Sequence, residues 1–531
     1  MNRKIRRRGA KYGLVGSAAV MIGMSVAGGS AHADATQDKW GFTPISTGAL
    51  GCSTTGDPAW AAPLVGAKLM SAGDVATLVG GGATTIGREN DMIALSADGT
   101  YLFSSSENGA PSDGISRYTL TGPGAGTKEI LTPGPAVPAT PFTNPSWSRM
   151  DGLYWYAPSG MLLGGEEYSI TAANTANTQA RGGGVWQINP TTGAYVRLDW
   201  LGSLAHEGIV FAGGALYFGD EQRNAGFFKA VPTDVNDLTK GGTLYFLAGS
   251  GIDASGWKQV TNPDNAANEA INLGGILFDR PEDVDARNGR VYFTVTEPQG
   301  DADTRKGNYN GTATGGVDVT KNQVVNRGGV YSLNTAGFPD LATQSGAQPP
   351  YTKIAPMIEV QDPTYANQAA AQAQQGLQFP DNMAFDGRGH LWLHEDIPDS
   401  TTSTFTSGID TSKQVRNQQD ELYVYELDGT GTAIVDAGTT SKGVKAADMR
   451  SSDPTAALAC TNEFTGGIFA SNGLDLFINQ QHNANPTFKL SLTDPLPAQV
   501  PEAPVTALLS LGAAGLLGGA FALNRRKAAR A

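Results

Sequence analysis

The order of hydrophobic and polar positions along the chain repeats six times. Each copy starts with an acidic or amide residue before an apolar step. It continues through a Gly-centred turn into a short β-type run and ends on another polar residue. The copies run over Asn90–Glu107, Asp151–Glu167, Glu207–Glu221, Glu282–Glu297, Asp381–Asp396 and Glu463–His482. Strand units that recur at intervals of tens of residues predict a β-propeller with one copy in each blade. We therefore predict an all-β, six-bladed propeller.

Alternating apolar positions after the copies predict further strands in each blade, for example at 184–188, 329–333 and 422–427. Residues 301–326 and 361–378 are polar and rich in Gly, Asn, Thr, Ala or Gln, which predicts loop insertions. Little helix is expected.

The two ends of the chain differ in composition from the repeats. Residues 1–33 have a basic head, an apolar stretch and the cleavage pattern Ala31-His32-Ala33, which predicts an export signal of the Sec or twin-arginine kind. We expect the propeller over 34–485 and a Pro-rich stalk over 486–502. Residues 503–531 combine an apolar run with basic residues, which predicts a transmembrane or sorting tail. The protein is thus expected to be exported, and then either anchored at the cell surface or membrane or secreted after processing.

The net charge limits the kinds of binding partner that we expect. A formal net charge of −13 argues against nucleic acid, whose phosphates need a basic surface. We expect a monomer.

Export permits a disulfide between the two cysteines, Cys52 and Cys460, which would join the first and last blades. Two unpaired buried thiols are the alternative.

The acids at matching places in the repeats predict a metal site. When the ring closes, these side chains point at one central axis. Carboxylates that converge repel one another, so they either bind metal ions or take up protons. Calcium takes about six to eight oxygen ligands, and a ring of carboxylates supplies them. Acids at strand ends also cap turns in many propellers, and this structural role is the one we expect for Glu107, Asp220 and Glu297.

Taken together, several stretches resemble the PhoX-type alkaline phosphatases, which are exported bacterial phosphomonoesterases on a six-bladed propeller. The similar stretches occur once per blade, in the same order, from about Asp91 to Asn485. They are Asp151-Gly152-Leu153 with 162–167, 204–208, Arg280-Pro281-Glu282-Asp283-Val284, 380–386, and Glu463-Phe464-Thr465-Gly466 with 477–482.

This resemblance implies hydrolysis of small phosphate monoesters at a cluster of calcium and ferric ions. It makes Arg280 the residue that binds the substrate phosphate and serves catalysis, with Asn382 also at the substrate. The implied metal ligands are Glu207, Glu282, Asp381, Glu166, Glu167 and Glu463.

One position departs from the family pattern. The family has an iron-binding cysteine directly before the Glu166-Glu167 pair, and this chain has Gly165 there. Thiolate suits iron, whereas carboxylates suit calcium or magnesium. Calcium is therefore expected, and iron lacks its family ligand. Three possibilities stay open: the protein uses calcium alone, it holds an altered set of metals, or it has lost activity.

Two other functions fit the same pattern of acids. One is a calcium-dependent propeller lactonase or esterase, in which calcium faces a carbonyl oxygen instead of a phosphate. The other is a non-catalytic calcium-binding propeller at the cell surface. Arg280 separates the first of these from a phosphatase, because its loss would impair phosphate ester turnover much more than lactone turnover.

Overall fold

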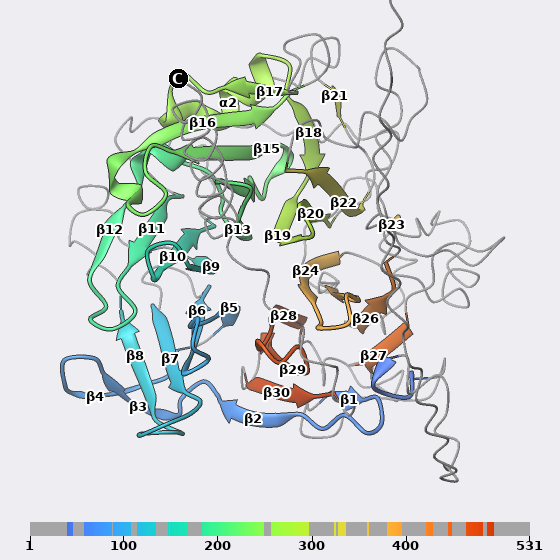
Figure 1. Ribbon diagram of the computed structural model, residues 1–531. Coiled ribbons are helices and arrows are strands. Elements are labelled where there is room, and N and C mark those ends of the chain that lie inside the picture. Colours follow the sequence, from blue (N-terminus) through green and yellow to red (C-terminus); the bar gives the residue numbers. More distant parts are fainter. Residues whose placement is uncertain are drawn as a thin grey trace, which may run out of the picture.

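Six β-sheets surround a central axis in the computed structural model (Figure 1), which confirms the predicted all-β, six-bladed propeller. The structure describes residues 40–45, 58–87, 89–107, 114–133, 147, 149–167, 183–248, 256–296, 323–324, 328–335, 358–359, 380–395, 421–427, 444–448, 463–481 and 486–492. The predicted export signal, the transmembrane or sorting tail, Cys52 and Cys460 all lie outside these residues. None of the described helices has the length and apolar character needed to span a membrane.

Each of the six repeats forms the inner hairpin of one blade. The innermost strands, in blades 1 to 6, are β5 (Asn90–Leu95), β9 (Met150–Tyr156), β13 (Ile209–Ala212), β19 (Pro281–Arg287), β24 (Pro380–Phe385) and β28 (Glu463–Phe469). Their antiparallel partners are β6 (Tyr101–Ser106), β10 (Met161–Glu166), β14 (Ala215–Gly219), β20 (Arg290–Val295), β25 (Leu391–Glu395) and β29 (Asp475–Gln481).

The outer strands complete the blades. The third strands are β7 (Ile115–Thr119), β11 (Val185–Ile188), β15 (Arg223–Pro232), β22 (Gly329–Asn334), β26 (Glu421–Tyr425) and β30 (Thr487–Ser491). The fourth are β8 (Lys128–Thr132), β12 (Tyr195–Arg197), β16 (Gly242–Leu247), β23 (Ile358–Glu359), β27 (Val444–Asp448) and β2 (Ala67–Met70). The strands predicted around 184–188, 329–333 and 422–427 are thus β11, β22 and β26.

A few elements add to this plan. Blade 1 also holds β3 (Val75–Leu78) and β4 (Ala83–Thr85), and blade 3 holds β17 (Trp257–Gln259) with β18 (Ile276–Asp279) and β21 (Gln323–Val324) beside it. Helical segments are short: α2 (Ala266–Asn272) and three 3₁₀ turns at Asp199–Leu201, Leu238–Lys240 and Pro263–Asn265. Of the two predicted insertions, 301–326 and 361–378, the structure describes only residues 323–324, which form β21.

Strands from the start of the described chain close the ring. β1 (Ala59–Trp60) pairs with β27 at the edge of blade 5, and β2 pairs with β30 at the edge of blade 6. Trp60 packs on Phe464 and Phe488 of blade 6, with ring centroids 5.6 and 5.4 Å apart. Because β30 belongs to blade 6, the sheet extends past the boundary predicted at residue 485 and into the predicted stalk.

Aromatic side chains fill the space between neighbouring blades. Phe227 of blade 3 stacks on Phe293 of blade 4 at 4.2 Å between centroids, and Trp392 of blade 5 meets Phe469 of blade 6 at 5.4 Å. Such pairs add about 0.5–1.5 kcal/mol each beyond the area they bury. This packing fixes the distance between blades and so the spacing of whatever side chains face the axis.

A β-bulge near the start of the innermost strand recurs in most blades. In blade 4, Pro281 pairs with Val295 and Val284 with Phe293, so Glu282 and Asp283 together oppose one residue. The same shift occurs in blades 1, 5 and 6, and blade 2 has its counterpart across Gly164 and Glu166. A bulge bends the strand and redirects its side chains. In these five blades it sets which residue of the copy faces the axis.

Candidate metal centre

Five acids occupy the same register position at the axis. Each directly follows the residue that forms the last strand pair before the bulge, or the residue equivalent to it in blade 3. We call them the axis acids: Asp91, Asp151, Glu207, Glu282 and Asp381. All five are buried. In blade 6 the same position holds Thr465, because Phe464 pairs with Gln480 just before the bulge.

A second row of acids follows the end of the second strand in the first three blades. These strand-end acids are Glu107, Glu167 and Glu221. In each blade the backbone N–H donates to the carbonyl of the residue two places before the axis acid, at 2.9 Å for Glu107, 3.0 Å for Glu167 and 3.0 Å for Glu221. The repeated bond holds this row at one height relative to the axis acids.

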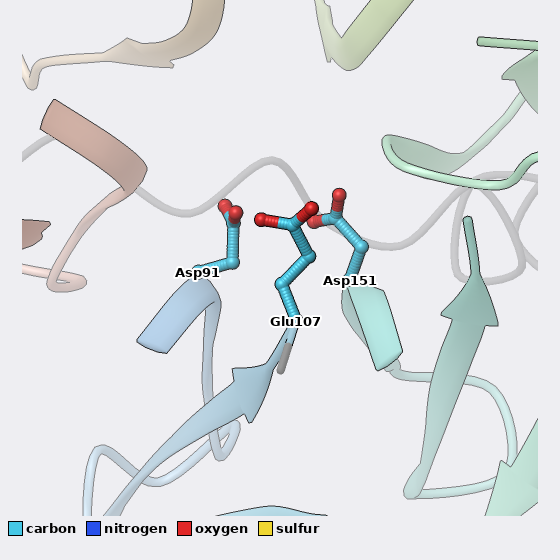
Figure 2. Close-up of side chains that lie close together, drawn as sticks. All are labelled: Asp91, Glu107 and Asp151. Atoms are coloured by element: carbon cyan, nitrogen blue, oxygen red, sulfur yellow. The ribbon is translucent and has the colours of Figure 1, made fainter. Parts of the chain in front are cut away.

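The two rows together form three groups of carboxylates whose oxygens lie within 4.8 Å of one another. The groups are Asp91 with Glu107 and Asp151, Asp151 with Glu167 and Glu221, and Glu207 with Glu221 and Glu282. Figure 2 shows the three carboxylates of the first group turned toward one another from β5, the end of β6 and β9. Asp151 and Glu221 each belong to two groups, so the acids make one continuous cluster from blade 1 to blade 4.

Several oxygens of this cluster are buried without a hydrogen-bond partner in the described part of the protein. They are Asp151 Oδ1, Glu207 Oε2, Glu221 Oε2 and Glu282 Oε2. A buried polar atom without a partner is costly, and a cation removes that cost. Carboxylate oxygens suit hard cations such as calcium and magnesium. The donor set therefore fits calcium.

Burial and mutual repulsion perturb the protonation of these acids. Burial, followed by the charges of neighbouring acids, raises the pKa of Asp91, Asp151 and Glu207 well above the ordinary range. Burial likewise raises the pKa of Glu282, although Arg280 opposes the shift. Glu221 is the exception: burial acts to raise its pKa, but Arg280, Glu167 and Arg149 together lower it.

Arg280 contacts the cluster through two acids. Its Nη2 donates to Glu221 at 2.6 Å, and its Nε lies 3.0 Å from Glu282. The backbone at Arg280 is left-handed, with φ 57°, which is uncommon for a residue with a side chain. The structure thus places this predicted phosphate-binding residue directly at the carboxylate cluster.

Asn382 connects three blades at the axis. Its Nδ2 donates to Glu207 Oε1 at 2.6 Å, and its Oδ1 accepts a hydrogen bond from the backbone N–H of Gly466. This fixes one carboxylate oxygen of Glu207, the acid that groups with Glu221 and Glu282. Asn382 therefore orients an axis acid in this structure, and the place at the substrate that the resemblance implies stays a prediction.

The predicted metal ligands divide into two sets. Glu207, Glu282 and Asp381 are axis acids, and Glu167 is a strand-end acid. Glu166 points the other way, as alternate residues of a strand do, and accepts a hydrogen bond from Trp186 Nε1 at 2.9 Å. Glu463 lies two residues before Thr465, outside the axis position. The ligand roles themselves stay predictions.

The cluster also holds residues that were not predicted as ligands. Asp91 lies inside one repeat copy, Asp151 and Glu221 lie at the ends of two others, and the sequence predicts a structural role for Glu107. Arg149 was not singled out, although it makes ion pairs with Glu107 and Glu167, the latter at 2.8 Å. Its signal in the sequence is its place two residues before Asp151, the same spacing that separates Arg280 from Glu282.

Gly165 does not offer room for the cysteine that the resemblance implies. A Cβ at this position would lie 2.6 Å from the carbonyl oxygen of His206 and 2.7 Å from its Cβ. Blade 3 packs directly on Gly165 here, and His206 N donates to Glu166 O at 2.9 Å. No described residue supplies a thiolate to the cluster. The centre therefore does not fit a thiolate-bound iron.

The fold and the cluster define a six-bladed propeller with a carboxylate centre on its axis. Comparison with known families gives the assignment: the alkaline phosphatase PhoX family matches residues 156–484, and the chain belongs to this family.

One solved structure shares the architecture at low sequence identity. The chain resembles Pseudomonas fluorescens PhoX in complex with vanadate, a transition-state analogue, with a TM-score of 0.53, 15% identity, and 86% of this chain and 98% of that one covered. It also matches a Trichoderma reesei enzyme of carbohydrate-active family AA12 with a TM-score of 0.39, 13% identity, and coverage of 84% and 100%. No curated protein sequence matches the chain.

Proposed function

We propose that this protein is an exported, metal-dependent phosphatase that hydrolyses small phosphate monoesters at the carboxylate cluster. One observation carries the proposal: in a chain of the PhoX family, the continuous cluster from Asp91 to Glu282 has Arg280 bound at its edge. The related Pseudomonas protein is described in complex with vanadate, which supports phosphoryl chemistry on this fold.

Calcium is the cation we propose for the centre. Asp151, Glu207, Glu221 and Glu282 would hold it, because each has a buried oxygen without a hydrogen-bond partner among the described residues. Bound calcium would polarise a phosphoryl oxygen and offset the charge of the acids. Iron is not proposed, because the thiolate position is Gly165.

Arg280 binds the phosphoryl group in this mechanism. A guanidinium matches two phosphoryl oxygens with two parallel N–H donors. Glu221 and Glu282 hold the Arg280 side chain, so little conformational freedom is lost when substrate binds. Asn382 keeps the Glu207 carboxylate in place. The products are an alcohol and inorganic phosphate.

Hydrolysis of p-nitrophenyl phosphate tests the proposal. We expect turnover with calcium, loss of turnover after chelation and recovery when calcium is returned. Arg280→Gln is expected to impair this turnover far more than turnover of a lactone panel. A folded, calcium-loaded protein without turnover, also with iron supplied, would contradict the phosphatase function. Lactone hydrolysis that is insensitive to Arg280→Gln would then point to a lactonase, and calcium binding without any turnover to a binding protein.

A further inference from the structure

Arg149 and Arg280 occupy the same place in blades 2 and 4. Each lies two residues before an axis acid, and each has a left-handed backbone, with φ 50° for Arg149 and 57° for Arg280. The carbonyl of Arg149 accepts from the N–H of Glu167 at 3.0 Å, and that of Arg280 from the N–H of Thr296 at 3.1 Å. The two residues are therefore equivalent in backbone, hydrogen bonding and register.

Their side chains also make equivalent contacts. Arg149 pairs with Glu107, the strand-end acid of the preceding blade, just as Arg280 pairs with Glu221, the strand-end acid of its preceding blade. Each adds a second carboxylate from its own blade, Glu167 for Arg149 and Glu282 for Arg280. The left-handed backbone alone does not explain this, because Glu89 shares it at the same position in blade 1 with φ 50°.

Exposure places the two arginines on the outside of the cluster. The side chain of Glu282 is 0% exposed and that of Glu221 4%, whereas Arg280 is 24% and Arg149 46% exposed. A ligand that approaches the carboxylates from this side meets the guanidinium groups first. Ala205 holds the equivalent position in blade 3, between them, and brings no charge.

We propose that Arg149 is a second phosphoryl-binding residue, which works with Arg280 on the same anionic group. This rests on the proposed function. Both ion pairs of Arg149 use Nη2, and within the described residues neither Nη1 nor Nε is engaged. A guanidinium carries five N–H donors, so Arg149 can keep its carboxylates and still donate to phosphoryl oxygens. Two arginines also offset the negative charge of the acids that an anionic ester would otherwise meet.

Kinetics and binding of Arg149→Gln test the inference, with p-nitrophenyl phosphate as substrate and inorganic phosphate as inhibitor. Loss of charged hydrogen bonds is expected to raise both KM and the inhibition constant of phosphate about tenfold to a hundredfold. Arg149→Lys, which keeps the charge without the planar fork, should lie between this variant and the wild type. Bound calcium should be unchanged in both variants.

Arg117→Gln is the matched control. Arg117 makes a partly buried ion pair with Glu129 at 2.7 Å on the outer strands of blade 1, away from the axis. It should lose some stability and keep the wild-type KM. A wild-type KM and phosphate inhibition in Arg149→Gln would overturn the inference. So would a fall in bound calcium that matches the fall in affinity and is reversed by Arg149→Lys, because Arg149 would then act only by positioning the acids that hold calcium.

Calorimetry with inorganic phosphate separates this inference from the proposed function. If the calcium-loaded wild type hydrolyses no ester but binds phosphate, and Arg149→Gln loses that binding, the phosphatase function fails and the arginine pair stands. If the wild type binds no phosphate at all, both are overturned.

Discussion

Gly165→Cys restores the residue that the family pattern has at this position, and we expect it to destabilise the protein without creating an iron site. The new Cβ would lie 2.6 Å from the His206 carbonyl oxygen and 2.7 Å from the His206 Cβ. Non-bonded carbon atoms prefer about 3.5–4.0 Å, so the entry to blade 3 would have to retreat by about 1 Å. Overpacking of this kind costs about 1–3 kcal/mol.

The retreat is resisted by the bonds that hold blade 3 at this point. His206 N donates to Glu166 O at 2.9 Å, and Gly152 N to His206 O at 3.4 Å. Since the next residue is the axis acid Glu207, the movement would also disturb the carboxylate cluster. Calcium affinity is therefore expected to fall together with stability.

The assay combines urea unfolding with metal analysis after exposure to iron and calcium. Gly165→Ala is one control, because it has the same clash without a thiol. Ser105→Cys is the other, because Ser105 holds the equivalent place in blade 1 and already accommodates a side chain of similar size. A Gly165→Cys protein with wild-type stability and one bound iron per chain would refute the reasoning.

Three further outcomes follow from the cluster. Glu282→Gln is expected to lower bound calcium and phosphatase activity together, since Glu282 shares a carboxylate group with Glu221; normal metal content with full activity would exclude it as a ligand. Asn382→Ala removes the 2.6 Å bond to Glu207 and should cost about 1–3 kcal/mol in the free energy of unfolding by urea, and an unchanged value would contradict its orienting role. Burial raises the folded-state pKa of acids such as Asp151 above the ordinary 3.8, so the contribution of these acids to the stability of the metal-free protein is fully present below that pH and is lost as pH rises through the folded pKa. Thermal unfolding between about pH 5 and pH 8 should show this fall without calcium and not with it, and a metal-free Tm that rises over this range would contradict it.

The inner hairpins were predictable because each copy joins an acid to a strand with alternating apolar residues. The side chain that faces the axis was harder to predict. Register decides it, and a bulge shifts register by one residue without a fixed sequence signal. In blade 6 the bulge brings Thr465 to the axis and leaves Glu463 two residues away. Side-chain chemistry alone pointed to Glu463.

Arg149 escaped prediction for a related reason. The position two residues before the axis acid shares one carbonyl hydrogen bond in blades 1 to 4, and its side chains differ between these blades: Glu89, Arg149, Ala205 and Arg280. The backbone there is left-handed at Glu89, Arg149 and Arg280. Arginine recurs at this place only in blades 2 and 4, so residue types compared along the chain show no repeat that runs through all the blades. The pairing of β1 and β2 with the last two blades was equally hidden, because short strands that meet distant partners leave no local pattern.

The way the ring closes bears on how the chain folds. β2 pairs with β30, so blade 6 takes its strands from opposite ends of the described chain, and β1 makes a similar contact with blade 5. The chain loses conformational entropy when its two ends are brought together, and the contacts of β1 and β2 stabilise the fold only after that. Closure of the ring is therefore expected to be a slow step. Blades 1 to 4 can assemble from local hairpins while the chain is still being made. The axis acid of blade 5 and the contacts of Asn382 then come into place late, so we expect the metal centre to be completed only when both ends of the propeller have met.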